Sequence, residues 1–245
     1  MSPTISVVIP VRDDAAELHQ CLRHLEQQHL RPHEVIVVDN GSRDDSAAVA
    51  RAAGARVIAE PRPGIPFAAA AGYDASRGDV IARLDADSRP RPGWTAAVSA
   101  RLSDPEVDAL TGWGLFRDLP PLLGWPATIT YLAAYYAMTG AAIGALPLWG
   151  SSMAIRRTAW EQARSQVHLT EDVHDDMDLA FVLGPRPGSP AATVRFEPRM
   201  RADVSARSLR PGPQWNLRLR RAGTTLRTHW DSAPPWQRWG ARGES

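Results

Sequence analysis

The chain has 245 residues and a mass of 26.7 kDa, and its 44% hydrophobic and 22% charged residues exclude a disordered chain and allow a sizeable core. All 28 basic residues are arginine, and a formal net charge of +1 gives no indication of a nucleic-acid partner. A single cysteine, Cys21, excludes an internal disulfide and a cysteine-rich metal site and fits a reducing compartment. The first residues show no signal-peptide pattern, so we expect a cytoplasmic protein.

Short apolar runs rich in β-branched residues alternate with segments of helical spacing over the first 90 residues. We predict strands within the stretches 5–11, 34–42, 55–60 and 79–88. We predict helices between them, at 13–28, 43–54 and 65–78. The first helix has Asp14 and Glu17 at capping-box spacing. This alternation predicts right-handed βαβ units and a mostly parallel sheet.

The second half of the chain carries a weaker pattern. A helix is expected at 89–102 and a strand at 107–116, and "WGSSMAIRRTAW" returns to a mixed pattern after a long uncharged segment. No internal repeat and no long linker divides the chain. We therefore expect one domain over 1–230, followed by a loose C-terminal tail at 231–245.

Residues 119–155 contain no aspartate, glutamate, arginine or histidine. The segment is long enough to cross a bilayer, but it is only moderately hydrophobic and prolines bracket it. A single span would also separate the residues before and after it, which we expect to share one site. We therefore expect a buried or interfacial segment, with peripheral contact at the inner face of a membrane. The nine arginines between 195 and 227 would face phosphates or a membrane surface, or form a solvated face.

Carboxylates stand at the ends of two predicted strands. Asp39 ends "VIVVD" and is followed by "NGS", while Asp85 and Asp87 follow "VIARL" as a D-x-D. Because the carboxyl ends of parallel strands form the ligand-binding edge of an open sheet, these residues are candidates for a site. Residues i and i+2 of a strand point the same way, so Asp85 and Asp87 would offer two carboxylates to one Mg²⁺ or Mn²⁺. Each motif by itself is also compatible with an ordinary turn.

The stretch "HLTEDVHDDMDLAF" holds five carboxylates within eight residues: Glu171, Asp172, Asp175, Asp176 and Asp178. If a helix begins near Asp175, then Asp175 and Asp178 take the N-cap and N3 positions, and Asp176 faces a cleft. Crowded negative charge raises the pKa of one carboxyl towards a range useful for a general base. A purely capping, solvated role for all five carboxylates stays open.

Taken in order, "VVIPVRDD", "VIVVDNGSRDDS", "GDVIARLDADSRPRPGW" and "WGSSMAIRRTAW" with "HDDMDLAF" resemble the landmarks of family 2 glycosyltransferases, which are inverting enzymes of the GT-A fold. The resemblance spans about residues 4–183. It implies a Rossmann-like, mostly parallel sheet flanked by helices, with a nucleotide-binding half at 1–90. The acceptor half, 91–230, would end in a helical region. It also implies transfer of a sugar from a UDP- or GDP-sugar to an acceptor hydroxyl.

The same resemblance implies roles for individual residues. The nucleoside of the donor would lie against Pro10, Val11, Arg12, Asp14, Asp39 and Gly64. The diphosphate would lie against Asp85, Ala86 and Asp87, through Mg²⁺ or Mn²⁺ on the two aspartates. The family's E-D-x-D-L motif matches "DDMDL", so Asp176 would be the catalytic base with Asp175 beside it. Asp172 in "TED" is the rival base.

The sequence also departs from the family pattern. Where many members have an Arg and an Asn before the D-x-D strand, this chain has Ala69 and Ala70, so those donor contacts are missing or come from elsewhere. The Q-x-x-R-W motif of processive synthases is absent, which favours transfer of a single sugar to a sugar, lipid-linked or small-molecule acceptor. Aromatic residues that would stack on sugar rings or line an acceptor groove, or simply pack, are Trp113, Trp125, Tyr131, Tyr135, Tyr136 and Trp149. Further metal ligands would come from His168, His174 and His229.

Two other functions compete with this one. A sugar-phosphate nucleotidyltransferase also carries acids at strand ends, but "VIPVRDDAAE" lacks the glycine-rich loop that such an enzyme usually needs. A non-catalytic relative that binds only a nucleotide is favoured by Ala69 and Ala70. The sugar, the nucleotide base, the acceptor and the oligomeric state are not determined by these patterns.

Overall fold

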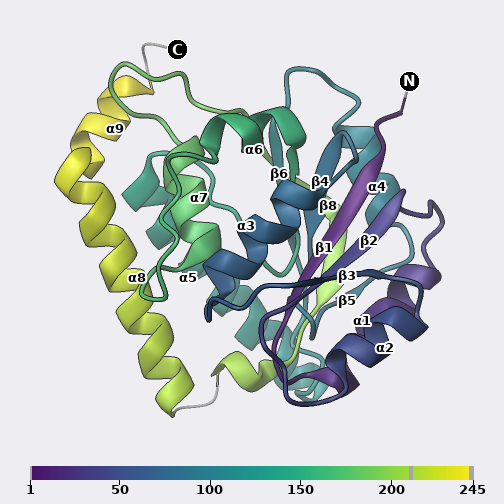
Figure 1. Ribbon diagram of the computed structural model, residues 1–245. Coiled ribbons are helices and arrows are strands. Elements are labelled where there is room, and N and C mark those ends of the chain that lie inside the picture. The colour runs from purple at the N-terminus through teal and green to yellow at the C-terminus, as the bar shows by residue number, and fades with distance from the viewer. Residues whose placement is uncertain (1, 210–211, 243–245) are drawn as a thin grey trace.

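One sheet of eight strands runs through the part of the chain that the computed structural model describes, residues 2–209 and 212–242 (Figure 1). The strand order is β3-β2-β1-β4-β7-β6-β8-β5. Helices cover both faces of this sheet, so the chain has the α/β architecture that the sequence predicts.

The first half of the chain forms the parallel half of the sheet. Its strands are β1 (Ile5–Val11), β2 (Glu34–Asp39), β3 (Arg56–Ala59) and β4 (Val80–Arg83). Its helices are α1 (Ala15–Glu26), α2 (Ser46–Ala52) and α3 (Ile65–Ala75). The pairs β1·β2, β1·β4 and β2·β3 are all parallel, which confirms the predicted βαβ units. The carboxyl ends of β1, β2 and β4 therefore meet at one edge of the sheet.

The second half of the chain completes the sheet with mixed strand directions. Its strands are β5 (Arg89–Pro90), β6 (Ala109–Trp113), β7 (Met153–Arg156) and β8 (Val194–Asp203). Its helical elements are α4 (Trp94–Arg101), α5 (Pro121–Ile143), α6 (Arg157–Ala163), α7 (Asp175–Leu183), the 3₁₀ turn η1 (Ala206–Leu209), α8 (Pro213–Ser232) and α9 (Pro235–Ala241). The helix expected at 89–102 begins only at Trp94, because β5 first pairs with β8.

Strand β7 is antiparallel to both β4 and β6, so this half of the sheet is less parallel than the sequence suggests. Met153 at the start of β7 lies opposite Arg83 at the end of β4. The residues just before β7 are therefore brought to the carboxyl end of β4. This reversal of direction adds a loop from the second half of the chain to the ligand-binding edge.

Side chains of the sheet alternate between two cores, one on each face of the sheet. In β1, Val7 and Ile9 join the core under α1, α2 and α4, whereas Val8 joins the core under α3, α6 and α7. In β4, Ile81 belongs to the second of these cores. Arg83 follows the same alternation, so its side chain lies on the α3 and α7 face.

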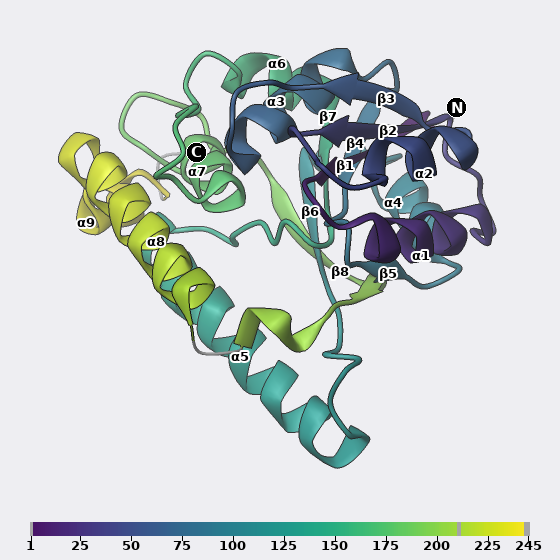
Figure 2. The same cartoon turned by 60° about the horizontal axis from the view of Figure 1, so that its bottom comes forward.

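Helices α5, α8 and α9 lie on the side of the molecule away from α1 and α2 in both views (Figure 1 and Figure 2). Helix α9 replaces part of the loose tail expected at 231–245. Its Arg238 is 1% exposed and donates to the carbonyl oxygens of Ala233 and Phe181, because a buried guanidinium needs acceptors. Residues 243–245 lie outside the described part. No helix in that part is both long and apolar enough to cross a bilayer.

Candidate active site

The predicted nucleoside-binding residues come together at the carboxyl edge of β1 and β2. Val11 lies opposite Asp39 in the sheet register, and the Asp39 Oδ1 atom accepts a hydrogen bond of 2.9 Å from the Ser42 N–H. The Asn40 side chain links this edge to the start of α3, because its Oδ1 accepts from the Gly64 N–H at 2.8 Å. Gly64 has φ of 123°, a conformation that favours glycine.

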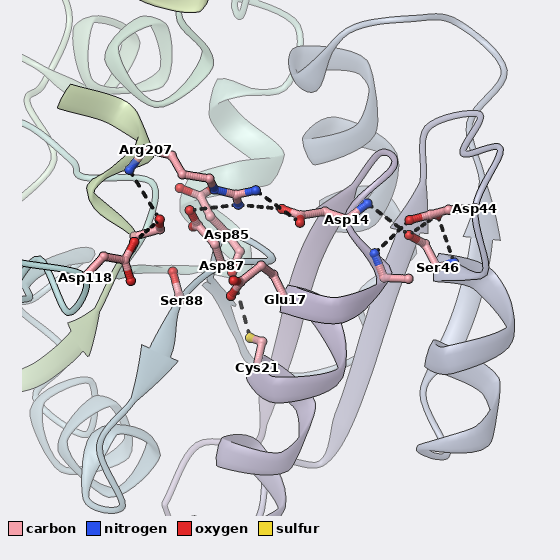
Figure 3. Close-up of polar contacts among 12 residues, drawn as sticks. Asp14, Glu17, Cys21, Asp44, Ser46, Asp85, Asp87, Ser88, Asp118 and Arg207 are labelled. Atoms are coloured by element: carbon pink, nitrogen blue, oxygen red, sulfur yellow. Dashed lines mark hydrogen bonds and ion pairs between the residues drawn. The ribbon is translucent and has the colours of Figure 1, made fainter. Parts of the chain in front are cut away.

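Asp14 takes the N-cap position of α1 as predicted, but its side chain makes no capping hydrogen bond. Its carboxylate instead pairs with the guanidinium of Arg207, at 2.6 Å and 3.2 Å (Figure 3). Glu17 likewise pairs with Arg89 and Arg117 rather than closing a capping box. Charge-assisted bonds to arginine are stronger than a bond to a neutral backbone N–H. Both carboxylates therefore bind arginine instead of capping α1.

The two aspartates of the D-x-D lie directly after β4, with Ala86 buried between them. Asp87 lies 3.2 Å from Arg207, so one guanidinium contacts both Asp14 and Asp87 (Figure 3). Burial and the neighbouring charge of Asp85 raise the pKa of Asp87 to about 6, although Arg207 opposes the shift. The site therefore contains a largely buried carboxylate that holds a proton more readily than an exposed aspartate does.

Arg83 joins the D-x-D to the carboxylates of α7. Its Nη2 atom lies 3.0 Å from Asp85, and its Nη1 atom donates to Asp175. The side chain is 3% exposed, and among the described residues its Nε atom has no hydrogen-bond partner. The Asp175 charge raises the pKa of Arg83 despite burial, so the guanidinium stays charged. This residue was not singled out from the sequence, although an arginine at the end of an apolar strand was a visible signal.

The site contains two acid pairs, Asp85 with Asp87 and Asp175 with Asp176. The loop before β7 contacts both acid pairs through adjacent residues. The Gly150 N–H donates to Asp176 Oδ2 at 2.6 Å, and the Ser151 hydroxyl donates to Asp85 Oδ2 at 2.6 Å. A Cβ atom at position 150 would lie 2.9 Å from the Arg83 guanidinium carbon and 2.9 Å from Asp176 Oδ2. Only glycine lets the main chain approach this closely. "WGSS" was recognised as a landmark, but its bonds to the two acid pairs were not predicted.

Helix α7 has its N-cap at His174, so Asp175 and Asp176 take its first two positions and no side chain caps it. The prediction that Asp175 and Asp178 are cap residues is therefore wrong, because Asp175 binds Arg83 and Asp178 is buried. The alternative that all five carboxylates are solvated also fails, since Asp176 is 5% and Asp178 1% exposed.

Asp176 accepts three hydrogen bonds. His174 Nδ1 and the Met177 N–H reach its Oδ1 at 2.6 Å and 2.7 Å, and Gly150 reaches its Oδ2. Burial raises the pKa of Asp176, but the His174 charge and these donors outweigh it and hold the pKa below its usual range. Burial and the Asp176 charge raise the pKa of Asp175, with Arg83 opposing the shift. The two neighbours are therefore driven in opposite directions.

The histidines expected as extra metal ligands are engaged with aspartates in the structure. Asp178 accepts from His168 Nδ1 at 2.8 Å and from His229 Nε2 at 2.7 Å, while His174 holds Asp176. The D-x-D lies in neither of the two histidine-containing clusters among the described residues. These contacts fix the start of α7 and its packing on α8.

The rival base lies apart from these pairs. Asp172 has a side chain that is 65% exposed, and its carboxylate lies 3.8 Å from Arg220 of α8. Its neighbour Glu171 is exposed as well, and its main-chain carbonyl accepts from Arg221. The structure therefore does not bring Asp172 together with Asp175 and Asp176.

Most of the aromatic residues considered for acceptor binding pack instead in a small core that α5 shares with the segments around Phe116 and Val204. The hydroxyls of Tyr135 and Tyr136 donate to main-chain carbonyls, and Trp149 is 7% exposed. Trp125, at 46% exposed, lies with its ring 6.2 Å from that of Trp113. Ala69 and Ala70 line a small pocket between α3 and α7 beside Asp175, where longer side chains would otherwise reach.

A family model described as glycosyl transferase family 2 matches residues 6–163, which is well over half of the chain. The chain belongs to glycosyl transferase family 2. The match runs from β1 to the end of α6 and includes the D-x-D, whereas Asp175 and Asp176 lie beyond it. Family membership favours the predicted glycosyltransferase over the nucleotidyltransferase alternative.

Curated relatives match this family 2 chain over only part of its length. The chain is 41% identical over 98 residues to an undecaprenyl-phosphate 4-deoxy-4-formamido-L-arabinose transferase of Pseudomonas aeruginosa, covering 36% of this chain and 29% of that protein. It is 31% identical over 118 residues to glycosyltransferase AglE of Haloferax volcanii, covering 45% and 39%. The chain thus spans well under half the length of these relatives.

Solved structures match the whole fold. A mannosyltransferase of Pyrobaculum calidifontis, in complex with GDP-Man and Mn²⁺, has a TM-score of 0.67 at 21% identity and covers 98% of this chain and 68% of that one. Glucosyl-3-phosphoglycerate synthase of Mycobacterium tuberculosis, in complex with phosphoglyceric acid, has a TM-score of 0.63 at 21% identity, covering 93% and 80%. These likenesses confirm the GT-A fold of the family 2 chain.

Proposed function

We propose that this chain is an inverting glycosyltransferase that moves one sugar from a UDP- or GDP-sugar to an acceptor hydroxyl. The observation that carries the proposal is the meeting of two acid pairs at one edge of the sheet. Arg83 contacts Asp85 of the first pair and Asp175 of the second. Gly150 donates to Asp176 and Ser151 donates to Asp85, so this loop also contacts both pairs. An inverting transfer needs such a pairing, with one acid group at the leaving diphosphate and another at the attacking hydroxyl.

Asp176 is the proposed general base. A carboxylate offers about four lone-pair positions, and the donors from His174, Met177 and Gly150 use three of them. One position on Oδ2 is left for an acceptor hydroxyl. The donors orient the carboxylate and keep it ionised, and they also lower its pKa, so it would take the hydroxyl proton only as the bond to the anomeric carbon forms. Asp175, held by Arg83, is the proposed supporting partner.

Asp85 and Asp87 are the proposed holders of Mg²⁺ or Mn²⁺. The residues fit a divalent cation, because burial and the charge of Asp85 raise the pKa of Asp87, and Arg207 already places a cation between Asp14 and Asp87. When bound, the ion would offset the charge that grows on the leaving diphosphate. Structural neighbours solved with Mn²⁺ and GDP-Man or UDP-Glc are consistent with such a donor.

The donor nucleoside is proposed to lie along the ends of β1 and β2. Pro10, Val11 and Arg12 form the end of β1 and its continuation, and Asp39 stands opposite Val11. The Asn40 contact with Gly64 holds the start of α3 at the same edge. The proposed base stands on α7 and not on these strands, so the leaving nucleoside diphosphate and the attacking hydroxyl would lie on opposite sides of the anomeric carbon, as inversion requires.

The acceptor is proposed to enter between α5 and α7, and α5 with α8 to rest on an anionic membrane surface. Helix α5 has no charged residue over 23 positions, yet Leu122 is 90%, Ile129 57% and Met138 74% exposed. Helix α8 carries exposed arginines such as Arg220 and Arg227. A lipid-linked acceptor would suit this surface, and a relative whose name includes undecaprenyl phosphate is compatible with it. Cytoplasmic location stays a prediction.

The test is a donor panel with Mn²⁺, followed by proton NMR of the product to read its anomeric configuration. We expect inversion relative to the donor. Asp176→Asn should lower kcat by about 10²–10⁴-fold while leaving nucleotide affinity near the wild-type value. Asp172→Asn is the matched control and should retain activity, because Asp172 lies on the surface.

Other results would contradict the proposal in separate ways. A product with retained configuration would overturn the inverting mechanism. Loss of activity in Asp172→Asn, but not in Asp176→Asn, would move the base to Asp172. Tight nucleotide binding without turnover of any donor would favour a non-catalytic relative.

A further inference from the structure

Arg207 occupies a central position at the proposed metal site (Figure 3). Its guanidinium lies 2.6 Å and 3.2 Å from the two oxygens of Asp14 and 3.2 Å from Asp87 Oδ2. Asp14 belongs to the start of α1 and Asp87 to the end of β4, so two parts of the proposed donor site converge on one cation. Arg207 is one of the nine arginines between 195 and 227, of which Arg210 lies outside the described residues.

The chain presents Arg207 from an anchored turn. Asp118 accepts from the Ser205 hydroxyl and, at 3.1 Å, from the Ala206 N–H, and the Arg207 N–H donates to the Ser205 oxygen at 3.2 Å. Strand pairing of Phe116 with Val204 supports the same turn. The main chain of Arg207 is therefore held in place by contacts that do not involve its side chain.

The contacts of Arg207 are open to solvent. Its side chain is 47% exposed, and those of Asp14 and Asp87 are 23% and 21% exposed. Ion pairs of this exposure are weak, on the order of 0–1 kcal/mol, and exchange readily. A guanidinium also binds phosphate oxygens in the same forked geometry that it uses with a carboxylate. Arg207 can thus exchange one anion for another without unfolding its surroundings.

We propose that Arg207 is a built-in positive charge of the donor site that changes its partner during donor binding. In the free protein it forms ion pairs with Asp14 and Asp87. Once a divalent ion binds Asp87, Arg207 binds the donor diphosphate. The inference rests on the proposed function, because it needs a nucleoside diphosphate and a divalent ion at this edge. It assigns two opposite effects to one side chain. Arg207 competes with the metal ion when no donor is bound and attracts the donor when the metal ion is present.

The first measurement is Mn²⁺ binding to the donor-free protein by isothermal titration calorimetry. Arg207→Gln removes the competing charge, so Mn²⁺ affinity should rise about two- to five-fold. The second measurement is UDP and GDP binding at saturating Mn²⁺. Here Arg207→Gln should weaken the nucleotide that the wild-type protein binds by roughly tenfold, since a charge-assisted bond to phosphate is lost.

Arg199→Gln is the matched control. Arg199 is a 65% exposed arginine of β8 that pairs with Glu197, and neither residue belongs to the proposed site. This variant should leave both affinities unchanged. Arg207→Lys keeps the positive charge without the fork, so its Mn²⁺ affinity should stay close to that of the wild-type protein.

Opposite shifts of the two affinities support the inference, because a purely structural role would move both downwards. Two unchanged affinities in Arg207→Gln overturn it, and so does a parallel loss of both. A wild-type protein that binds neither Mn²⁺ nor UDP or GDP overturns the proposed function itself, together with this inference.

Discussion

Arg83 is a buried arginine whose surroundings are strongly acidic. It stands at the end of β4 and contacts Asp85 and Asp175, and Asp176 lies close enough to affect the pKa of the guanidinium. Each of these carboxylates serves a different part of the proposed reaction. A single guanidinium thus stabilises the metal-binding acid and the acid beside the base at once. Such a charge cannot be removed without leaving buried carboxylates unpaired.

We expect Arg83→Met to destabilise the protein by about 3–5 kcal/mol near neutral pH, since it breaks a buried ion pair. Without its cation, Asp175 would have a pKa raised further in the folded state. The folded protein then binds more protons than the unfolded chain, so the deficit should grow as pH rises above the unfolded pKa of about 4. Urea unfolding at several pH values measures this trend.

Arg157→Met is the control for Arg83→Met, because Arg157 makes an exposed pair with Glu161 and one hydrogen bond to the Gly78 carbonyl, so its loss should cost about 1 kcal/mol. Adding Asp175→Asn to Arg83→Met should recover part of the lost stability. A variant as stable as the wild-type protein at neutral pH would disprove the bridging role of Arg83.

The raised pKa of Asp87, about 6, makes a separate prediction for metal binding. A proton competes with the metal ion for this carboxylate, so Mn²⁺ affinity should fall as pH drops through about 6, by up to roughly tenfold per unit. Calorimetric titrations between about pH 7 and pH 5 measure the effect. Asp87→Asn should bind weakly at every pH, and a flat profile for the wild-type protein would rule out Asp87 as a ligand.

At the scale of elements, α7 is held from several sides by its charged residues. Asp178 is 1% exposed and accepts from His168 in the preceding loop and from His229 of α8. The His229 ring also stacks on Phe181, with ring centroids 4.5 Å apart. Helix α7 thus joins α8 to the sheet through one buried carboxylate. The proposed base stands two residues before Asp178 on the same helix, so this packing sets its position.

Asp178→Asn should destabilise the protein by about 1–3 kcal/mol, because the acceptor of two buried or half-buried imidazoles loses its charge. The change should also speed amide hydrogen exchange in α8 more than in β1. Asp231→Asn is the control, since Asp231 is an exposed aspartate of α8. Unchanged exchange in α8 would mean that apolar packing alone docks this helix.

At the scale of the whole molecule, the chain has a charged, site-bearing edge and an uncharged outer helix. Helix α5 presents large apolar side chains to solvent along much of its length, although none of the described helices could span a bilayer. Helices α8 and α9 lie on the same side of the molecule, and α9 exposes Trp236 and Trp239. An apolar face beside arginines matches the chemistry of an anionic lipid surface.

We expect the protein to sediment with vesicles that contain phosphatidylglycerol more than with neutral vesicles, and salt should weaken this binding. The double change Leu122→Asp and Ile129→Asp should reduce binding at least about tenfold, because two apolar anchors are lost. Leu30→Asp is the control, since Leu30 is 41% exposed and follows α1, away from α5. Equal binding by both variants would exclude α5 as the contact.

The sequence by itself determined the parallel half of the sheet and the edge that carries the site. Apolar runs that end in Asp39 and in Asp85 report local burial, and parallel strands must bring their carboxyl ends together. The antiparallel entry of β7 was not predictable in this way, because strand direction depends on where a long connection returns. For the same reason, Gly150 and Ser151 could be recognised as a landmark without their partners being known.

Only the tertiary structure decided which charges meet. Arg83 and Asp175 are 92 positions apart in the chain, and Asp14 and Arg207 are 193 apart, so no periodic pattern links either pair. The chain has 28 arginines, and composition cannot distinguish Arg83 and Arg207, which contact the acid pairs, from the other arginines. Residue spacing predicts which side chains share a face of one element. For the buried pair of Arg83 and Asp175, the choice of partner follows from burial, because a buried carboxylate must find a cation within reach of its own position in the fold.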